Sequence, residues 1–240
     1  MENNNVVYHA QINGFADLWI KSKEKIDFEK FDYDIEIIFE GDSSDVYVPF
    51  APNHSWDKAL TIMDEMADNF DHRKYRPKEI IKTRWNETLD WWDEKFEILY
   101  GEFKYDLRSK YTPIETEHSI WPLYIKEFLD KVEEACTVFT GYFPRTVEVY
   151  DPYLFDFETE NTDFIIELFS QLPTFSYFFM VSNKLFALLY LKKDSIRISG
   201  RNMLDIRKLQ IRLLIDDLLN KNILKSEKHA IVEFYHRKPL

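Results

Sequence analysis

An apolar seam of helical spacing runs through residues 85–103 and constrains the fold more than any other feature of the sequence. Large apolar side chains recur there at steps of 4, 3, 4, 3 and 4 residues: Trp85, Leu89, Trp92, Phe96, Leu99 and Phe103. Because an α-helix brings every third or fourth residue to the same side, this spacing predicts a helix that begins near Pro77 and ends near residue 103. The seam is expected to face a core.

Acidic residues occupy the other side of this predicted helix, and Trp91 lies beside the seam. An aromatic side chain among carboxylates suits tight association with a basic surface, because the charges steer the encounter and the ring provides apolar contact. The pattern therefore indicates a partner-binding surface. Its candidate residues are Glu87, Asp90, Trp91, Asp93, Glu94 and Glu97.

Two pairs of β-rich runs predict hairpins. Residues 33–39 and 46–50 flank a polar turn segment, and residues 174–181 and 184–191 are separated by a Ser-Asn dipeptide alone. The runs are rich in β-branched and aromatic side chains, which favour half-buried strands. We expect antiparallel pairing within each hairpin.

Helical patterns fill much of the remaining chain. Ser55 and Pro122 mark predicted helix starts, and Ser226 is expected to cap a last helix. Because strands and helices come in blocks rather than in alternation, the fold class is α+β, with antiparallel hairpins packed against amphipathic helices and a helical C-terminus. The other predicted helices cover residues 56–70, 122–140, 163–171 and 202–219.

The chain carries a net charge of −12, which is unevenly distributed. Residues 1–182 contain 18 basic and 37 acidic residues, a balance of −19, whereas residues 183–240 contain 13 and 6, a balance of +7. The basic C-terminal part either docks onto the acidic part or binds a partner. From the length of 240 residues we predict a single α+β domain, or alternatively a division into residues 1–110 and 111–240.

Several classes of site are excluded by what the sequence lacks. With five glycines and neither a GxGxxG nor a GxxxxGKS/T motif, the two common phosphate-binding loops cannot form. The single cysteine, Cys136, allows neither an internal disulfide nor a four-cysteine zinc site. The absence of a signal-peptide pattern and of a membrane-length apolar run predicts a cytoplasmic protein with no membrane contact, and we expect no cofactor.

The segment 155–159, FDFET, places two carboxylates at the end of a predicted strand. It resembles the first motif of the DnaQ-like 3′–5′ exonucleases, in which such carboxylates hold a pair of divalent metals that activate water. The resemblance implies metal ligands at Asp156 and Glu158, and at Asp205 in a second motif. The sequence departs from the family because this second motif follows after only 49 residues and no Asp follows Asp217. A solvated acidic segment is the interpretation that we favour.

Two further clusters carry polar or charged side chains at a suggestive spacing. His229, Glu233 and His236 lie at i, i+4 and i+7, so they would share one side of the predicted last helix. They are either metal ligands or, as we favour, a solvated polar face. The second cluster is basic and predicts contact with nucleic-acid phosphates. Its residues are Arg197, Arg201, Lys208 and Arg212.

The leading hypothesis is a non-enzymatic acidic binding protein that covers a basic surface of a partner protein, such as a toxin, a nuclease or a defence enzyme. The acidic residues 1–182 and the lack of a complete catalytic motif favour it. Bacterial toxin-immunity proteins, or antitoxins, and phage inhibitors of host defence share this composition, although no motif is shared. The alternatives are a metal-dependent nuclease or phosphoesterase using Asp156 and Glu158, and a nucleic-acid-binding module in the basic C-terminal region. The oligomeric state stays open.

Overall fold

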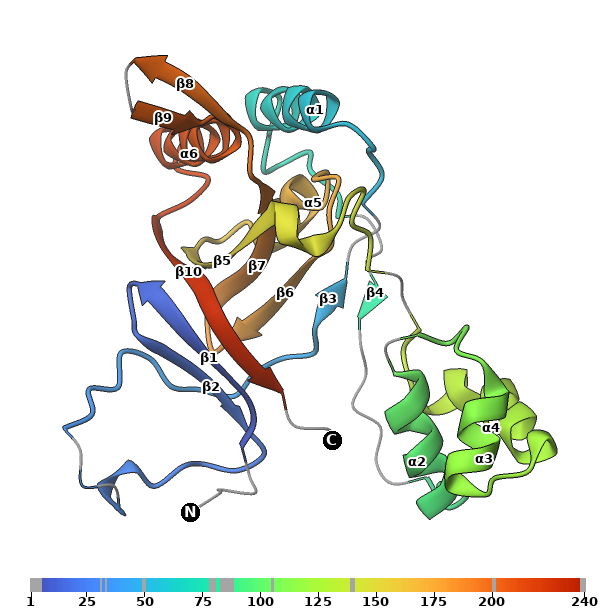
Figure 1. The fold of residues 1–240 in the computed structure, drawn as a ribbon. Helices are drawn as coiled ribbons and strands as arrows, with labels where there is room; N and C mark the ends of the chain where they lie inside the picture. Colours follow the sequence, from blue (N-terminus) through green and yellow to red (C-terminus); the bar gives the residue numbers. More distant parts are fainter. Residues whose placement is uncertain are drawn as a thin grey trace. The chain divides into compact units, whose positions relative to one another are not determined.

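The computed structural model describes residues 6–30, 32, 34–48, 51–77, 81–82, 89–104, 106–138, 141–199 and 202–237, which form two compact units. Unit 1 is built from residues 1–82 and 140–237, and unit 2 from residues 83–139 (Figure 1). Unit 2 is therefore an insertion between the two segments of unit 1, with boundaries at residues 82/83 and 139/140.

Within the described residues of unit 1, eight strands form one antiparallel sheet in the order β2-β1-β10-β5-β7-β6-β3-β4. Strands β8 (Ser195–Ser199) and β9 (Asn202–Asp205) form a two-stranded sheet that is separate from the large one. Short 3-10 helices lie at Phe28–Lys30 and Val147–Val149. The strands of the large sheet are β1 (Val6–Gly14), β2 (Leu18–Ser22), β3 (Tyr47–Val48), β4 (Ile81–Lys82), β5 (Tyr150–Glu158), β6 (Ser176–Val181), β7 (Lys184–Lys192) and β10 (Ser226–Arg237).

The structure bears out the α+β class and one of the two hairpins. Strands β6 and β7 pair across a turn in which Ser182 has a φ of 54°. The other hairpin was a wrong prediction, because residues 34–40 form no strand and β3 pairs with β6 and β4 instead. Partners distant in sequence thus outcompete the local pairing that the β-rich composition suggested.

The prediction of a helical C-terminus was also wrong. Residues 226–237 form strand β10, which lies between β1 and β5 in the sheet. Ala230 and Val232 are buried on one face and Ile231 packs on the other, which is the alternation of a strand covered on both sides. His229, Glu233 and His236 therefore lie on a strand, and the helical face proposed for them does not exist.

Helices α1 (Trp56–Asp68), α5 (Thr162–Phe169) and α6 (Ile206–Asn220) cover one face of the sheet (Figure 1). Phe155 and Phe157 of β5 point into this core, together with buried side chains of all three helices. Because side chains alternate along a strand, Leu154 and Asp156 point to the opposite face.

That opposite face lies inside the curl of the sheet. Trp19 of β2 stacks on Phe179 of β6, with ring centroids 5.6 Å apart and an interplanar angle of 6°. Four strands separate β2 from β6 in the sheet order, so this contact requires strong curvature. Ala10, Ile12, Leu188 and Val232 fill the same core.

Basic residues of the C-terminal part pair with acidic residues of earlier elements. Lys208 lies 2.9 Å from Asp151 of β5, and Arg207 lies 2.7 Å from Asp57 of α1. Ion pairs between Arg212 and Glu227 and between Lys221 and Asp68 extend the pattern. For these residues of α6 and its end, the charge asymmetry of the sequence reflects docking inside unit 1.

Helices α2 (Glu94–Phe103), α3 (Tyr111–His118) and α4 (Pro122–Ala135) form the described core of unit 2. The predicted seam is buried at Phe96, Leu99 and Phe103, which pack against α3 and α4. The helix is shorter than predicted, because the carboxylate of Asp93 accepts a hydrogen bond from the Phe96 N–H at 2.9 Å and caps the helix there. Residues 81–82 belong to β4, and residues 83–88 lie outside the described part.

No helix among the described residues combines the length and the apolar character needed to cross a membrane.

Candidate partner-binding surface

Two exposed apolar side chains stand at the start of α4. Trp121 is 80% exposed and Leu123 is 77% exposed, the highest values among the large apolar side chains that the structure describes. Single exposed apolar residues are common on protein surfaces, and two with such high exposure within three residues of the chain mark this helix start as a candidate contact site.

The local sequence explains why Leu123 faces outward and places Trp121 just before the first turn of α4. Pro122 occupies the first helical position, and Trp121 before it takes the N-cap position without a side-chain cap bond. The buried residues Ile125, Phe128 and Val132 define the inner side of α4 by their spacing of three and four. Leu123 is out of phase with that spacing and lies on the outer side.

Tyr124 connects this start of α4 to the start of α2. Its hydroxyl donates a short hydrogen bond to the carboxylate of Asp93, and its ring lies 5.0 Å from that of Phe96. The bond to the negative carboxylate raises the pKa of Tyr124 to about 12. Although burial opposes the charge of Asp93, the Tyr124 hydroxyl and the Phe96 N–H together lower the pKa of Asp93. The Asp93 carboxylate is thus held charged between the two helices.

The acidic residues predicted for partner binding have different environments. Asp90 and Glu94 are exposed, whereas Glu97 accepts a hydrogen bond from Trp92 Nε1 at 2.8 Å. Trp91 is half-buried, with Lys131 Nζ 5.5 Å from its ring centroid. The remaining candidate, Glu87, lies outside the described residues.

We define the helix-start surface as the residues that gather around the first turns of α2 and α4. The hydrogen bond between Tyr124 and Asp93 places both helix starts at one end of unit 2. Residues 83–139 contain 13 acidic and 7 basic residues, a balance of −6, so the exposed apolar pair lies in an acidic unit. The surface consists of Asp90, Asp93, Glu94, Trp121, Leu123 and Tyr124.

Sequence reasoning did not single out Trp121 and Leu123, although a signal was present. A tryptophan directly before a helix-starting proline occupies a position where Ser, Thr, Asp or Asn is preferred. The apolar phase of the following helix excludes Leu123 from the core. Reading both facts together predicts exposed apolar residues at this helix start.

The carboxylates of the nuclease alternative do not converge. Asp156 lies 2.7 Å from Lys184 Nζ, and Glu158 accepts a hydrogen bond from the Ser226 hydroxyl at 3.1 Å. Asp205 caps α6, which covers the opposite face of the sheet from Asp156. Among the residues described, no group of three or more His, Cys, Asp or Glu side chains is arranged to hold a metal ion.

Asp156 has a structural partner, and removing that partner is expected to destabilise unit 1. The Asp156 side chain is 7% exposed, and its Oδ1 has no hydrogen-bond partner among the described residues. Lys184→Met would leave this carboxylate without its cation, at about 3 kcal/mol of unfolding free energy because the pair is largely desolvated. Urea denaturation measures the loss. The matched variant Lys193→Met, whose lysine is 48% exposed, should lose less than about 1 kcal/mol. Equal losses would assign no special role to the buried pair.

The basic residues proposed for nucleic-acid contact do not form a common stripe. Arg197 is exposed on β8, and Arg201 lies outside the described residues. Although burial opposes its charge, hydrogen bonds with Tyr153 and Asp151 raise the pKa of Lys208. Arg212 is occupied by Glu227 at 2.9 Å. The nucleic-acid hypothesis therefore stays a prediction.

The helix-start surface therefore combines acidic residues of unit 2 with two exposed apolar side chains. Comparisons of the sequence with protein-family models and with curated proteins, and of the structure with solved structures, found no match.

Proposed function

We propose that the protein acts by binding, and that the helix-start surface of unit 2 covers a basic surface of a partner protein. The observation that carries the proposal is the exposure of Trp121 and Leu123 in a unit that carries six more acidic than basic residues. An apolar anchor surrounded by charge is the arrangement found at the centre and rim of protein interfaces.

The two parts of the surface contribute different things to binding. Burying one large aromatic side chain removes roughly 150–250 Å² from water, a gross gain of about 4–6 kcal/mol. The exposed carboxylates of Asp90 and Glu94 steer a positively charged partner and reject a negative one. Affinity therefore comes mainly from the apolar pair, and selectivity from the acids.

The same charge argues against a second copy as the occupant. Two units with a balance of −6 each would repel one another when their helix-start surfaces meet. A basic protein surface can both cover the apolar pair and attract the carboxylates. We extend the proposal to inhibitors of the immunity or counter-defence kind, because enzymes that act on nucleic acids carry basic clefts that an acidic protein can cover.

Substitutions that remove the negative charges of Asp90 and Glu94 test the role of these two exposed acidic residues. The double variant Asp90→Asn with Glu94→Gln should slow association with the captured partner several-fold and flatten its salt dependence, because rim charges act mainly on the association rate. The partner is first recovered with the immobilised full chain from a lysate of the organism that encodes it.

Glu133→Gln is the matched control, since Glu133 is an exposed acid at the far end of α4. It should leave the association rate unchanged within about twofold. Recovery of acidic proteins only, or an equal effect of the control and the double variant, would contradict the proposed function.

A further inference from the structure

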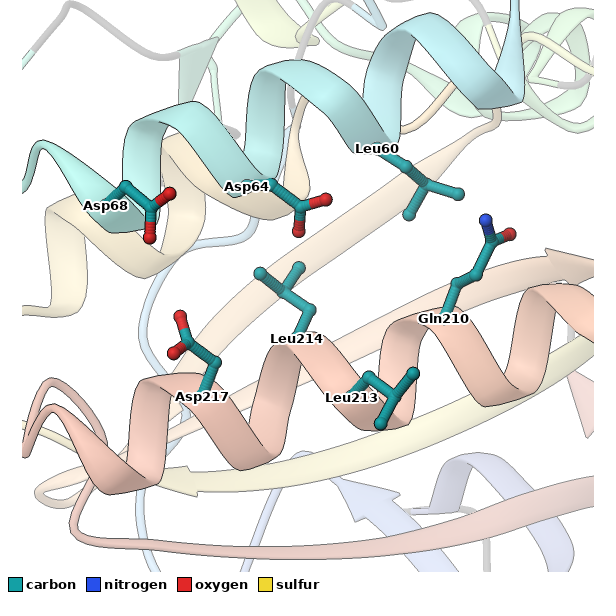
Figure 2. Close-up of a pocket in the computed structure, with 7 residues that line it drawn as sticks. All are labelled: Leu60, Asp64, Asp68, Gln210, Leu213, Leu214 and Asp217. Atoms are coloured by element: carbon teal, nitrogen blue, oxygen red, sulfur yellow. The ribbon is translucent and has the colours of Figure 1, made fainter.

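A second surface of interest lies in unit 1, between helices α1 and α6. The two helices run side by side in the same direction and enclose a groove of about 380 Å³ (Figure 2). In Figure 2, Leu60 and Asp64 point from α1 toward α6, and Leu214 and Asp217 point from α6 toward α1. The lining residues are Leu60, Asp64, Asp68, Gln210, Leu213, Leu214 and Asp217.

Cations of the chain bridge the two helices at both ends of this groove. At the helix starts, Arg207 Nη1 lies 2.7 Å from Asp57 Oδ1. At the helix ends, Lys221 Nζ lies 2.6 Å from both Asp68 Oδ1 and Asp217 Oδ2. Both ends of the groove between α1 and α6 thus place a basic side chain against aspartates.

Asp64 lies between these two bridges and lacks a cation of its own. Among the described residues its side chain forms no hydrogen bond or ion pair, and the positive charge of Lys221, which pairs with Asp68 and Asp217, acts on it without direct contact. Burial, followed by the nearby carboxylates of Asp68 and Asp217, raises the pKa of Asp64. Three aspartates face one lysine in the groove, so its formal balance is −2. The Asp64 side chain is exposed, so an incoming cation can reach its carboxylate.

The groove also has an apolar component. Leu60 and Leu214 are 5% and 3% exposed and form its floor. Leu213 is 59% exposed at its edge, and Leu209, one turn earlier on α6, is 39% exposed. An exposed leucine pair at i and i+4 forms a short apolar stripe along α6, beside the acidic groove.

We propose that this groove docks a basic amphipathic segment of a partner protein. Apolar side chains of the segment cover Leu209 and Leu213. One lysine or arginine of the segment enters beside Asp64 and becomes the third cation between α1 and α6, after Arg207 and Lys221. Charge complementarity selects this occupant, since an acidic segment would add to the excess of carboxylates. The proposal concerns unit 1 alone and does not rest on the helix-start surface of unit 2.

A synthetic peptide probe tests this docking. A fluorescently labelled helix of lysine and leucine, about 14 residues or four turns long, is titrated with the full chain at low ionic strength, and anisotropy is recorded. Binding is expected for this peptide and not for one with glutamate in place of lysine. Asp64→Asn should weaken binding about tenfold, the value of one charge-assisted hydrogen bond.

The matched control is Glu65→Gln, which removes the same charge one residue away on α1 from a side chain outside the groove lining. It should change the affinity less than about twofold. Equal weakening by both variants, binding of the glutamate peptide, or no binding of the lysine peptide would each overturn the proposal. Complete displacement of the peptide by spermine at equal charge concentration would overturn it too, because the site would then be one for a small polyamine.

A stability measurement shows that Asp64→Asn acts on the groove rather than on folding. The raised pKa means that the charged form of Asp64 is disfavoured in the folded protein relative to the unfolded chain, whose value is near 3.8. The aspartate therefore lowers stability at neutral pH, and this effect disappears as pH falls below the unfolded value. Asp64→Asn should melt at the same or a slightly higher temperature than wild type at pH 7. A clear loss of stability would show that Asp64 makes a stabilising contact and would remove the argument for a ligand.

Discussion

Replacing Trp121 with alanine is expected to weaken partner binding about 30-fold or more. Large aromatic anchors at interface centres contribute at least about 2 kcal/mol each, which corresponds to that change in affinity. Because Trp121 is 80% exposed, its removal should change the unfolding free energy by less than about 0.5 kcal/mol. Surface plasmon resonance with the captured partner measures the affinity, and the loss should appear mainly as faster dissociation.

Leu107→Ala is the control for this variant. Leu107 is also an exposed apolar residue of unit 2, in the connection between α2 and α3. Its removal should change the affinity less than about twofold, since it lies outside the helix-start surface. If both variants bind like wild type, Trp121 is not an anchor. If both weaken binding equally, general apolar contact rather than a defined surface holds the partner.

Replacing Phe128 with alanine is expected to unfold unit 2 while unit 1 stays folded. Phe128 is 1% exposed, and its ring lies 5.6 Å from Phe96 and 6.0 Å from both Trp92 and Phe103. Losing this side chain should cost about 3–5 kcal/mol. A unit of 57 residues has little more than that in total stability, so the loss removes most of it.

Hydrogen–deuterium exchange measures this directly. In Phe128→Ala, the amides of α2 and α4 should exchange rapidly, while those of β5 and β7 keep their protection. Phe178→Ala in β6 is the converse control, because Phe178 is fully buried in unit 1. Equal loss of protection in both units for either variant would show that the chain folds as one cooperative body.

The sequence was most informative where local patterns and tertiary packing agree. The seam spacing correctly predicted that Phe96, Leu99 and Phe103 lie in a core. It overextended the helix toward its N-terminus, because the capping preference of Asp93 outweighs the apolar periodicity before it. The hairpin β6–β7 was recognisable because its two strands are adjacent in the chain and a short polar turn separates them.

Elements that depend on distant partners were beyond local reasoning. Strand β10 carries a helix-like spacing of polar residues, but it forms the link in the sheet between β1 and β5. Backbone hydrogen bonds to two neighbouring strands decide its conformation. These bonds cannot be predicted from the intrinsic preferences of the residues of β10. Residues 34–40 are the reverse case, with strand-like composition and no strand partner.

In the candidate sites, too, contacts between residues distant in sequence could not be predicted from local patterns. Asp156 was a candidate metal ligand only through the resemblance of FDFET to an exonuclease motif, whereas its contact in space is Lys184 on the adjacent strand. The acidic groove combines α1 and α6, which are more than 130 residues apart, so its aspartates could not be grouped from the sequence. The acidity of unit 2 was predictable from composition, and the outward position of Leu123 could be read from the phase of α4.

Photo-crosslinking from position 123 tests the central claim most directly, namely that a basic partner docks on the helix-start surface. The photoreactive amino acid p-benzoylphenylalanine replaces Leu123, whose 77% exposure accommodates it, and in a second protein it replaces Glu133 at the far end of α4. After irradiation in a lysate of the organism that encodes the protein, position 123 should give a covalent adduct with a basic protein, and position 133 should not. No adduct at position 123, or the same adducts at both positions, would contradict the proposed binding surface.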